Sequence, residues 1–212
     1  MRIGILGSGD VGLKLAEGFV ATGNTVKIGT RSPEKISSWL AKHLGKVTAG
    51  SFADAAFFGE LIAIATLWEG TASAIEMAGS RNFAGKVVVD VTNPLDFSKG
   101  MPPRLATGHD DSAGETVQRQ LPEARVVKAF NIVGNSHMFH PDFQGGPPTM
   151  FICGNDEHAK KSVADILDEF GWEIVDIGGI EGSRLLEPLA MLWITYYFKT
   201  GTGNHAFKLL RK

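Results

Sequence analysis

Three glycines near the start of the chain have the spacing of a phosphate-binding turn, in the stretch Gly7-Ser8-Gly9-Asp10-Val11-Gly12. An apolar run precedes them and a helical pattern follows. In such a strand–turn–helix unit the first glycine permits the turn, the second lets the backbone approach a pyrophosphate, and the third allows close packing. The N–H groups at the helix start attract phosphate charge. We therefore predict a dinucleotide site on these six residues, with a plain glycine turn as the alternative.

The residues after the second predicted strand indicate which dinucleotide is bound. Chains that bind NAD usually carry Asp or Glu there, about 20 residues past the glycines. This chain has Gly29-Thr30-Arg31-Ser32 instead, with no acid. The planar guanidinium of Arg31 could donate two hydrogen bonds to a 2′-phosphate. Thr30 or Ser32 would add a hydroxyl, and Lys35 would add a second cation. We predict NADP(H); the alternative is a solvated Arg31 beside a Ser32 that only caps the next helix.

Small polar residues and apolar residues adjoin each other at the ends of three further predicted strands. Ligands in open α/β sheets bind beyond the carboxyl ends of the strands, so these residues are candidates to contact a nicotinamide ring. Core packing is the alternative for the two aromatic side chains, and a turn role is the alternative for the two asparagines. The candidates are Thr66, Leu67, Trp68, Asn93, Pro94, Ala129, Phe130 and Asn131.

Other arrangements that could do chemistry are weak. His137 and His140 have metal-ligand spacing but no recognisable further ligands. Cys153 lies in an apolar run and is expected to be a buried, unreactive thiol. No serine, histidine and acid form a pattern with a mechanism behind it. We predict no metal site, and no pattern here indicates a catalytic side chain.

Strand-like apolar runs alternate with helical patterns along the whole chain. The predicted strands are Arg2–Leu6, Thr25–Ile28, Val47–Ala49, Glu60–Thr66, Lys86–Val91, Arg125–Phe130, Met150–Cys153 and Glu173–Ile177. The predicted helices are Val11–Thr22, Glu34–Lys42, Phe52–Phe58, Ala72–Ala78, Ser112–Gln120, Glu157–Phe170 and Ser183–Phe198. Repeated strand-then-helix units predict an α/β fold of the Rossmann type, doubly wound, with a mostly parallel sheet and a small C-terminal helical and strand extension.

Two irregular stretches interrupt this alternation. Residues Asn93–Ser112 predict one long loop, and loops of more than ~12–15 residues are usually functional or disordered. The Gly/Pro-rich stretch Gln144–Pro148 is the best candidate for a boundary between a main dinucleotide-binding part and a smaller C-terminal part. We predict a dinucleotide-binding domain over residues 1–135 and a smaller part over 136–212 that packs on the same sheet and closes the site.

Composition excludes some classes of partner. The 212 residues carry a net charge of -2 and contain no run rich in Lys and Arg, so no nucleic-acid partner is expected. One cysteine favours a reducing compartment. The longest apolar stretch, Leu185–Phe198, contains Glu187 and Pro188, and it is too short for a membrane span. We therefore expect a cytoplasmic protein that does not bind membranes.

Taken together, the quoted residues make the sequence resemble the coenzyme F420-dependent NADP oxidoreductases, and also the reductase domain of the STEAP metalloreductases. The resemblance covers essentially the whole chain. It rests on GSGDVG at the start, GTRSPEK after the second strand, DVTNPL at Asp90–Leu95, VVKAFN at Val126–Asn131, FICGND at Phe151–Asp156, SRLLEPL at Ser183–Leu189 and GTGNHAFKLL at Gly201–Leu210.

The resemblance implies hydride transfer between NADPH and the deazaflavin F420 or a flavin-type acceptor. It also implies a tail around Gly203 and Leu209 that closes over the acceptor site, and a homodimer formed through the C-terminal helices. Two alternatives stay open from the sequence: a redox sensor that binds NADP(H) without turnover, and an NADP-dependent reductase of imines or hydroxyacids.

Overall fold

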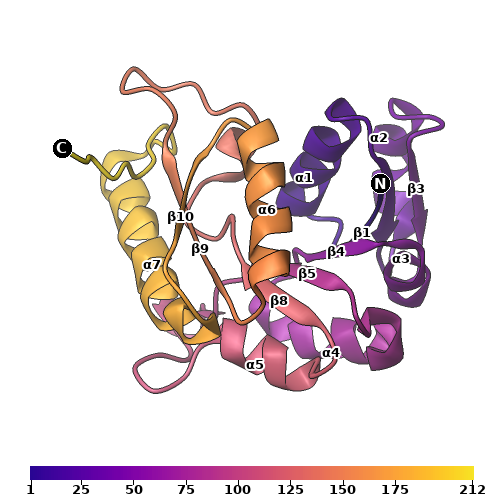
Figure 1. Cartoon of the computed structure of the whole chain (residues 1–212). Coiled ribbons are helices and arrows are strands. Elements are labelled where there is room, and N and C mark those ends of the chain that lie inside the picture. The colour runs from indigo at the N-terminus through magenta and orange to yellow at the C-terminus, as the bar shows by residue number, and fades with distance from the viewer.

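The computed structural model describes all residues from 1 to 212 and forms one large sheet with helices on both faces (Figure 1). The strand order is β10-β9-β8-β5-β4-β1-β2-β3. The strands are β1 (Arg2–Leu6), β2 (Thr25–Gly29), β3 (Val47–Gly50), β4 (Leu61–Ile64), β5 (Val87–Asp90), β8 (Arg125–Lys128), β9 (Thr149–Gly154) and β10 (Glu173–Asp176). The predicted Rossmann-type architecture is confirmed.

Within this eight-stranded sheet, all neighbouring strands run parallel except one pair. β8 and β9 are antiparallel, with Lys128 opposite Cys153. The central strand β4 is buried at every position, as expected for a parallel strand covered on both faces. β9 and β10 add to the same sheet as the first six strands, so residues 136–212 extend the sheet rather than form one of their own.

The helices divide into two layers, one on each face of the sheet. α1 (Asp10–Ala21) and α6 (Glu157–Glu169) share one buried apolar cluster, through side chains such as Phe19 and Leu167. α3 (Phe52–Phe58), α4 (Trp68–Ala78) and α5 (Ala113–Gln120) share another. Figure 1 shows α7 (Ser183–Thr200) beside β9 and β10, at the end of the molecule opposite α3. The short helices are η1 (Pro33–Ile36), α2 (Ser37–Ala41), η2 (Ser80–Phe83), η3 (Asn135–His137) and η4 (Ile180–Gly182).

Three local predictions need correction. α4 begins at Trp68, four residues earlier than predicted, since its first turn contains Gly70 and lacks a clear apolar period. The predicted helix Glu34–Lys42 is split into η1 and α2. Ser32 precedes η1 without accepting a capping hydrogen bond, which leaves its hydroxyl available. By contrast, Ser112 caps α5 as predicted, accepting from Glu115 N at 3.1 Å.

The stretch from Asn93 to Ser112 is not a plain loop. It contains a two-stranded hairpin, β6 (Leu95–Asp96) with β7 (Arg104–Leu105). Strands of two residues carry too little periodicity to be predicted. Because the hairpin follows β5 directly, it lies at the carboxyl end of that strand, beyond which ligands bind in such sheets.

Candidate functional site

The turn after β1 has the geometry that its glycines predict. Gly7 has a φ of 121°, a conformation that side chains other than hydrogen rarely adopt. A Cβ on Gly7 would also overlap the carbonyl oxygen of Ala65, and a Cβ on Gly12 would overlap the carbonyl oxygen of Gly7. The fold itself therefore requires the first and the third glycine, one for the turn and one for the packing of α1 on β1.

Gly9 differs from both, because nothing in the protein requires it. Its φ of -78° and ψ of 177° are open to any residue, and a Cβ there would meet no atom within 4 Å. Gly9 is the N-cap of α1, and no side chain caps this helix. The start of α1 thus combines open space with backbone N–H groups that lack a side-chain acceptor, an arrangement that fits a pyrophosphate.

The end of β2 lies next to this turn. Ser8 Oγ and Thr30 Oγ1 are 2.8 Å apart, and Ser32 N donates to Thr30 Oγ1 at 3.2 Å. Thr30 is buried, so its hydroxyl holds the two loops together. Arg31 and Lys35 are exposed, and their side chains form no ion pair or hydrogen bond. Two cations without partners therefore lie beside the phosphate turn, where a 2′-phosphate would bring negative charge.

The residues after β4 are placed differently from one another. Thr66 Oγ1 lies 2.8 Å from Thr71 Oγ1 in the first turn of α4, which fixes its hydroxyl. Leu67 is 70% exposed and leads into α4. Trp68 is half-buried and packs against the apolar cluster under α3, α4 and α5. Leu67 is therefore the most exposed of these three residues, and Trp68 is partly covered by the apolar cluster.

The residues after β8 are more deeply buried than predicted. Phe130 is 1% exposed, and its ring packs in the core with Phe170 at a centroid distance of 5.8 Å. The alternative of core packing therefore holds for the ring of Phe130. Its backbone has a φ of 63°, which is rare for a bulky residue and turns the chain sharply before Asn131. Ala129 and Pro94 are also buried.

Asn93 and Asn131 bond to each other across the ends of β5 and β8. Asn93 Nδ2 donates to the Asn131 carbonyl oxygen at 2.7 Å, and Asn131 Nδ2 donates to Asn93 Oδ1 at 3.0 Å. Asn131 Nδ2 also donates to the carbonyl oxygen of Leu186 in α7, at 3.0 Å. The two asparagines are thus brought together as candidates for one site, and α7 holds one of them.

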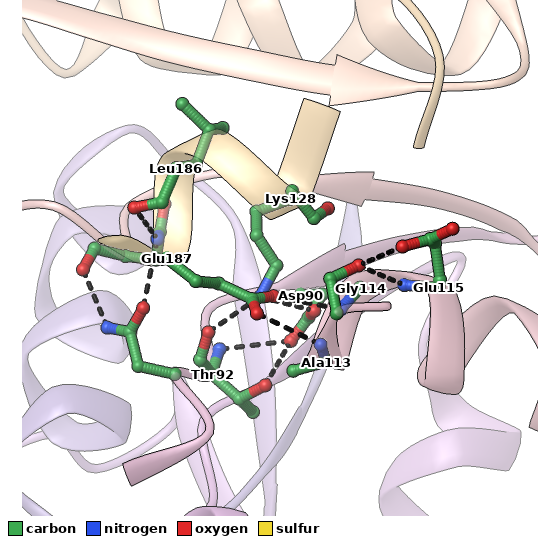
Figure 2. Close-up of polar contacts among 12 residues, drawn as sticks. Asp90, Thr92, Ala113, Gly114, Glu115, Lys128, Leu186 and Glu187 are labelled. Carbon is green, nitrogen blue, oxygen red and sulfur yellow. Dashed lines mark hydrogen bonds and ion pairs between the residues drawn. The ribbon is translucent and has the colours of Figure 1, made fainter. Parts of the chain in front are cut away.

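Lys128, Asp90 and Glu187 form a buried ion cluster (Figure 2). It adjoins the asparagine pair along the chain, because Lys128 bonds to Thr92, the residue before Asn93. Lys128 Nζ lies 2.9 Å from Asp90 Oδ2 and 2.9 Å from Glu187 Oε1, and it donates to the carbonyl oxygen of Thr92 at 2.7 Å. All three charged side chains are at most 1% exposed. The cluster joins β5, β8 and α7 at the carboxyl ends of the two strands.

The remaining charge of the cluster is satisfied by hydrogen bonds. Glu187 accepts from the backbone N–H groups of Ala113 and Gly114 at the start of α5, both at 3.0 Å. Asp90 Oδ1 accepts from the N–H and the hydroxyl of Thr92. Burial by itself would lower the pKa of Lys128, but the carboxylates of Asp90 and Glu187 outweigh it and raise that pKa. Lys128 therefore remains a cation in the folded protein.

The sequence analysis missed this cluster. A signal was present, since each of the three charges interrupts an apolar run: Asp90 in KVVVDV, Lys128 in RVVKAF and Glu187 in LLEPLA. Charged residues are almost never fully buried unless they are paired, so three such interruptions could have suggested one partnership.

Cys153 and the two histidines contact other residues of the protein. Cys153 is fully buried, as predicted, and lies 3.4 Å from Ser183 Oγ. His137 Nε2 pairs with Asn204 Oδ1 at 3.2 Å, and His140 packs against Phe139. No group of three or more His, Cys, Asp or Glu side chains converges anywhere in the protein. Nor does any helix combine the length and apolar character needed to traverse a bilayer.

We expect the native Cys153 thiol to resist alkylation at pH 8, because burial raises its pKa to about 11. Between pH 9 and that value an exposed thiol in the unfolded chain ionises while the folded one stays protonated. Stability should therefore fall as the pH rises through this window. Mass spectrometry after iodoacetamide treatment, with and without denaturant, measures the protection. Equal labelling in both conditions would contradict the burial.

Comparison with known proteins tests the family resemblance that the sequence predicts. Residues 2–94 match the family described as NADP oxidoreductase, coenzyme F420-dependent. The F420-dependent NADP reductase of Methanocaldococcus jannaschii is 34% identical, over 96% of this chain and 96% of that protein. The chain belongs to the F420-dependent NADP reductase family. The resemblance proposed from the sequence is thereby confirmed.

A solved structure and a metalloreductase give two further comparisons. A crystal structure of a candidate F420-dependent NADP reductase from Arthrobacter sp. FB24 has a TM-score of 0.95 and 40% identity, with each chain fully covered. Metalloreductase STEAP3 of Rattus norvegicus is 31% identical over 90% of this chain, but the match covers only 37% of STEAP3. The F420-dependent NADP reductases therefore match the chain over their whole length, whereas the metalloreductase matches it over one part.

Proposed function

We propose that this protein binds NADP(H) across the carboxyl ends of its parallel strands and transfers a hydride between that dinucleotide and coenzyme F420. The observation that carries the proposal is the start of α1, where Gly9 leaves open space that no protein atom requires. The unpartnered cations Arg31 and Lys35 beside it support NADP(H) over NAD. F420 as the acceptor rests on the names of the relatives, and a flavin is the alternative acceptor of the same chemistry.

Different sets of residues would bind different parts of the dinucleotide. The pyrophosphate lies on the turn from Gly7 to Gly12, and the 2′-phosphate lies at Thr30, Arg31, Ser32 and Lys35. The nicotinamide lies at Thr66, Leu67, Asn93, Pro94, Ala129 and Asn131, with the backbone of Phe130 beside it. NADPH, when bound, supplies the hydride. The protein binds and orients the two reactants and needs no acid or base of its own.

The direct test measures the loss of NADPH absorbance with purified protein and one acceptor at a time. We expect turnover with F420, and FMN, FAD and ferric chelates serve as comparisons. Turnover of a cyclic imine or a hydroxyacid, but of none of these acceptors, would contradict the proposal. Tight NADPH binding without turnover of any acceptor would instead support a redox sensor.

Replacing Arg31 with Asp should weaken NADPH binding about 10- to 100-fold and change NADH binding little. The substitution removes a charge-assisted hydrogen bond worth ~1.5–3 kcal/mol and places a like charge beside the phosphate. Dissociation constants from titration of intrinsic fluorescence test this. Arg81→Asp is the matched control, because Arg81 is an exposed arginine on η2, outside the crevice. Equal losses for NADPH and NADH would refute the 2′-phosphate assignment.

The homodimer and the cytoplasmic location remain predictions. One side of α7 leaves large apolar residues exposed at helical spacing, among them Leu185, Leu192 and Tyr196, which are 69%, 58% and 49% exposed. Exposed apolar residues on one face of a helix are typical of a surface that binds a partner. Sedimentation of the purified protein measures its oligomeric state directly.

A further inference from the structure

The hydroxyl of Thr30 lies between the two loops that we propose bind phosphate groups. Its Oγ1 is 2.8 Å from Ser8 Oγ in the turn after β1, and it accepts from Ser32 N at 3.2 Å in the loop after β2. Thr30 is only 8% exposed, and its side chain forms no other hydrogen bond. Ser8 is half-buried, and its hydroxyl forms no further hydrogen bond within the protein. Thr30 is therefore the inner member of a hydroxyl pair, and Ser8 is the outer member.

Burial determines which of the two hydroxyls donates to the other. Each hydroxyl carries one hydrogen and can accept two hydrogen bonds. If Ser8 donated to Thr30, the Thr30 hydrogen would have no acceptor within the protein, and a buried donor without a partner is costly. If Thr30 donates to Ser8, its hydroxyl both donates and accepts, because Ser32 N donates to it. Thr30 is therefore the donor, and the hydrogen of the Ser8 hydroxyl stays free.

The free hydrogen of Ser8 belongs to a residue whose neighbours favour an anion. Ser8 directly precedes Gly9, the N-cap of α1, and no side chain accepts from the backbone N–H groups at that helix start. The hydrogen bonds from Ser32 N to Thr30 and from Thr30 to Ser8 form a chain in one direction, and the groups of such a chain polarise one another. Ser8 is thus held in place by Thr30 and is strengthened as a donor.

We propose that Thr30 is a positioning residue, whose hydroxyl donates to Ser8 and so makes the Ser8 hydroxyl a donor to the pyrophosphate. The Thr30 hydroxyl itself does not bind the 2′-phosphate, for which Arg31, Ser32 and Lys35 remain the donors. This inference rests on the proposed binding of NADP(H) at these loops. It adds that Thr30 contributes to the affinity for any such dinucleotide and not to the preference for NADP(H) over NAD(H).

The test measures the binding of NADPH and NADH to Thr30→Val, Ser8→Ala and the double variant by calorimetry, so turnover is not needed. Thr30→Val should weaken both dinucleotides by the same factor, about three- to tenfold, because both contain the pyrophosphate. Ser8→Ala should weaken both about 10- to 100-fold, as the loss of a hydrogen bond to a charged group allows. Adding Thr30→Val to Ser8→Ala should cause no further loss, because Thr30 acts through Ser8.

Thr30→Ser is the matched control, because it keeps the hydroxyl and should retain the native affinity for both dinucleotides. A loss in Thr30→Val that is confined to NADPH would place the Thr30 hydroxyl at the 2′-phosphate and overturn the proposal, as would independent losses in the double variant. Native affinity in Ser8→Ala would also overturn it, whether or not Thr30→Val folds. In each of these cases the proposed function survives. If the native protein binds neither NADPH nor NADH, the proposed function itself fails, and this inference fails with it.

Discussion

Replacing Gly9 with Val should reduce the affinity for NADPH by at least about 100-fold while the protein remains folded. The valine side chain would extend into the space at the start of α1 that the pyrophosphate needs. A Cβ at this position would have no atom of the protein within 4 Å, and the backbone is open to any residue. The expected cost to folding is that of a poorer helix N-cap, about 1 kcal/mol. Calorimetric titration with NADPH measures the affinity, and thermal unfolding measures the stability.

The controls use two other glycines. A Cβ on Gly145, which is exposed in the loop before β9, would also meet nothing, so Gly145→Val should leave both the affinity and the stability unchanged. Gly12→Ala should behave in the opposite way to Gly9→Val and destabilise the protein, because its Cβ overlaps the Gly7 carbonyl oxygen. Native affinity in Gly9→Val would refute the phosphate-binding interpretation of the turn.

Replacing Lys128 with Met should lower the free energy of unfolding by about 3–5 kcal/mol. The substitution would leave Asp90 and Glu187 buried without their cation, and removing one partner of a buried ion pair costs about that much. Since small domains are stable by only ~5–15 kcal/mol, much of the stability would be lost. Urea unfolding followed by circular dichroism measures the difference at neutral pH.

Lys161→Met is the matched control for this prediction. Lys161 also pairs with a carboxylate, Asp165, at 2.9 Å, but its side chain is 73% exposed. Surface ion pairs typically contribute only about 0–1 kcal/mol, so this variant should unfold close to the native protein. A similar small loss in Lys128→Met would mean that the buried cluster contributes little beyond packing.

Features determined by neighbours in the sequence were predicted well. The turn from Gly7 to Gly12 was predicted because its three glycines lie within six residues, directly after an apolar run. The structure requires glycine at Gly7, which has a φ of 121°, and at Gly12, where a Cβ would overlap backbone. The absence of Asp or Glu after β2, from which NADP(H) was predicted, can also be read directly from the sequence. The cap at Ser112 was also local, since it involves a residue three positions away.

Features that depend on distant contacts were not predicted. Asp90, Lys128 and Glu187 lie in three separate segments, and only the fold brings their side chains within 3 Å. The burial of the Phe130 ring depends on α6 and the segment after it, where Phe170 lies. The antiparallel direction of β9 could not be predicted either, because an apolar run carries no information about which way the strand points.

That antiparallel direction has a consequence for how such proteins diversify. Because β9 runs antiparallel to β8, the segment from 129 to 148 begins and ends at the same edge of the sheet, beyond the carboxyl end of β8. The C-terminal tail reaches the same edge, where Thr149 N donates to the Phe207 carbonyl oxygen and Leu209 N donates to Thr149 Oγ1. The loops after β1 and β2, which we propose bind the phosphates, lie on the other half of the sheet. Residues 129–148 and the C-terminal tail can therefore change in length or composition without altering the loops after β1 and β2. On the proposed function, such changes would alter which molecule receives the hydride, while the binding of the dinucleotide phosphates stays the same.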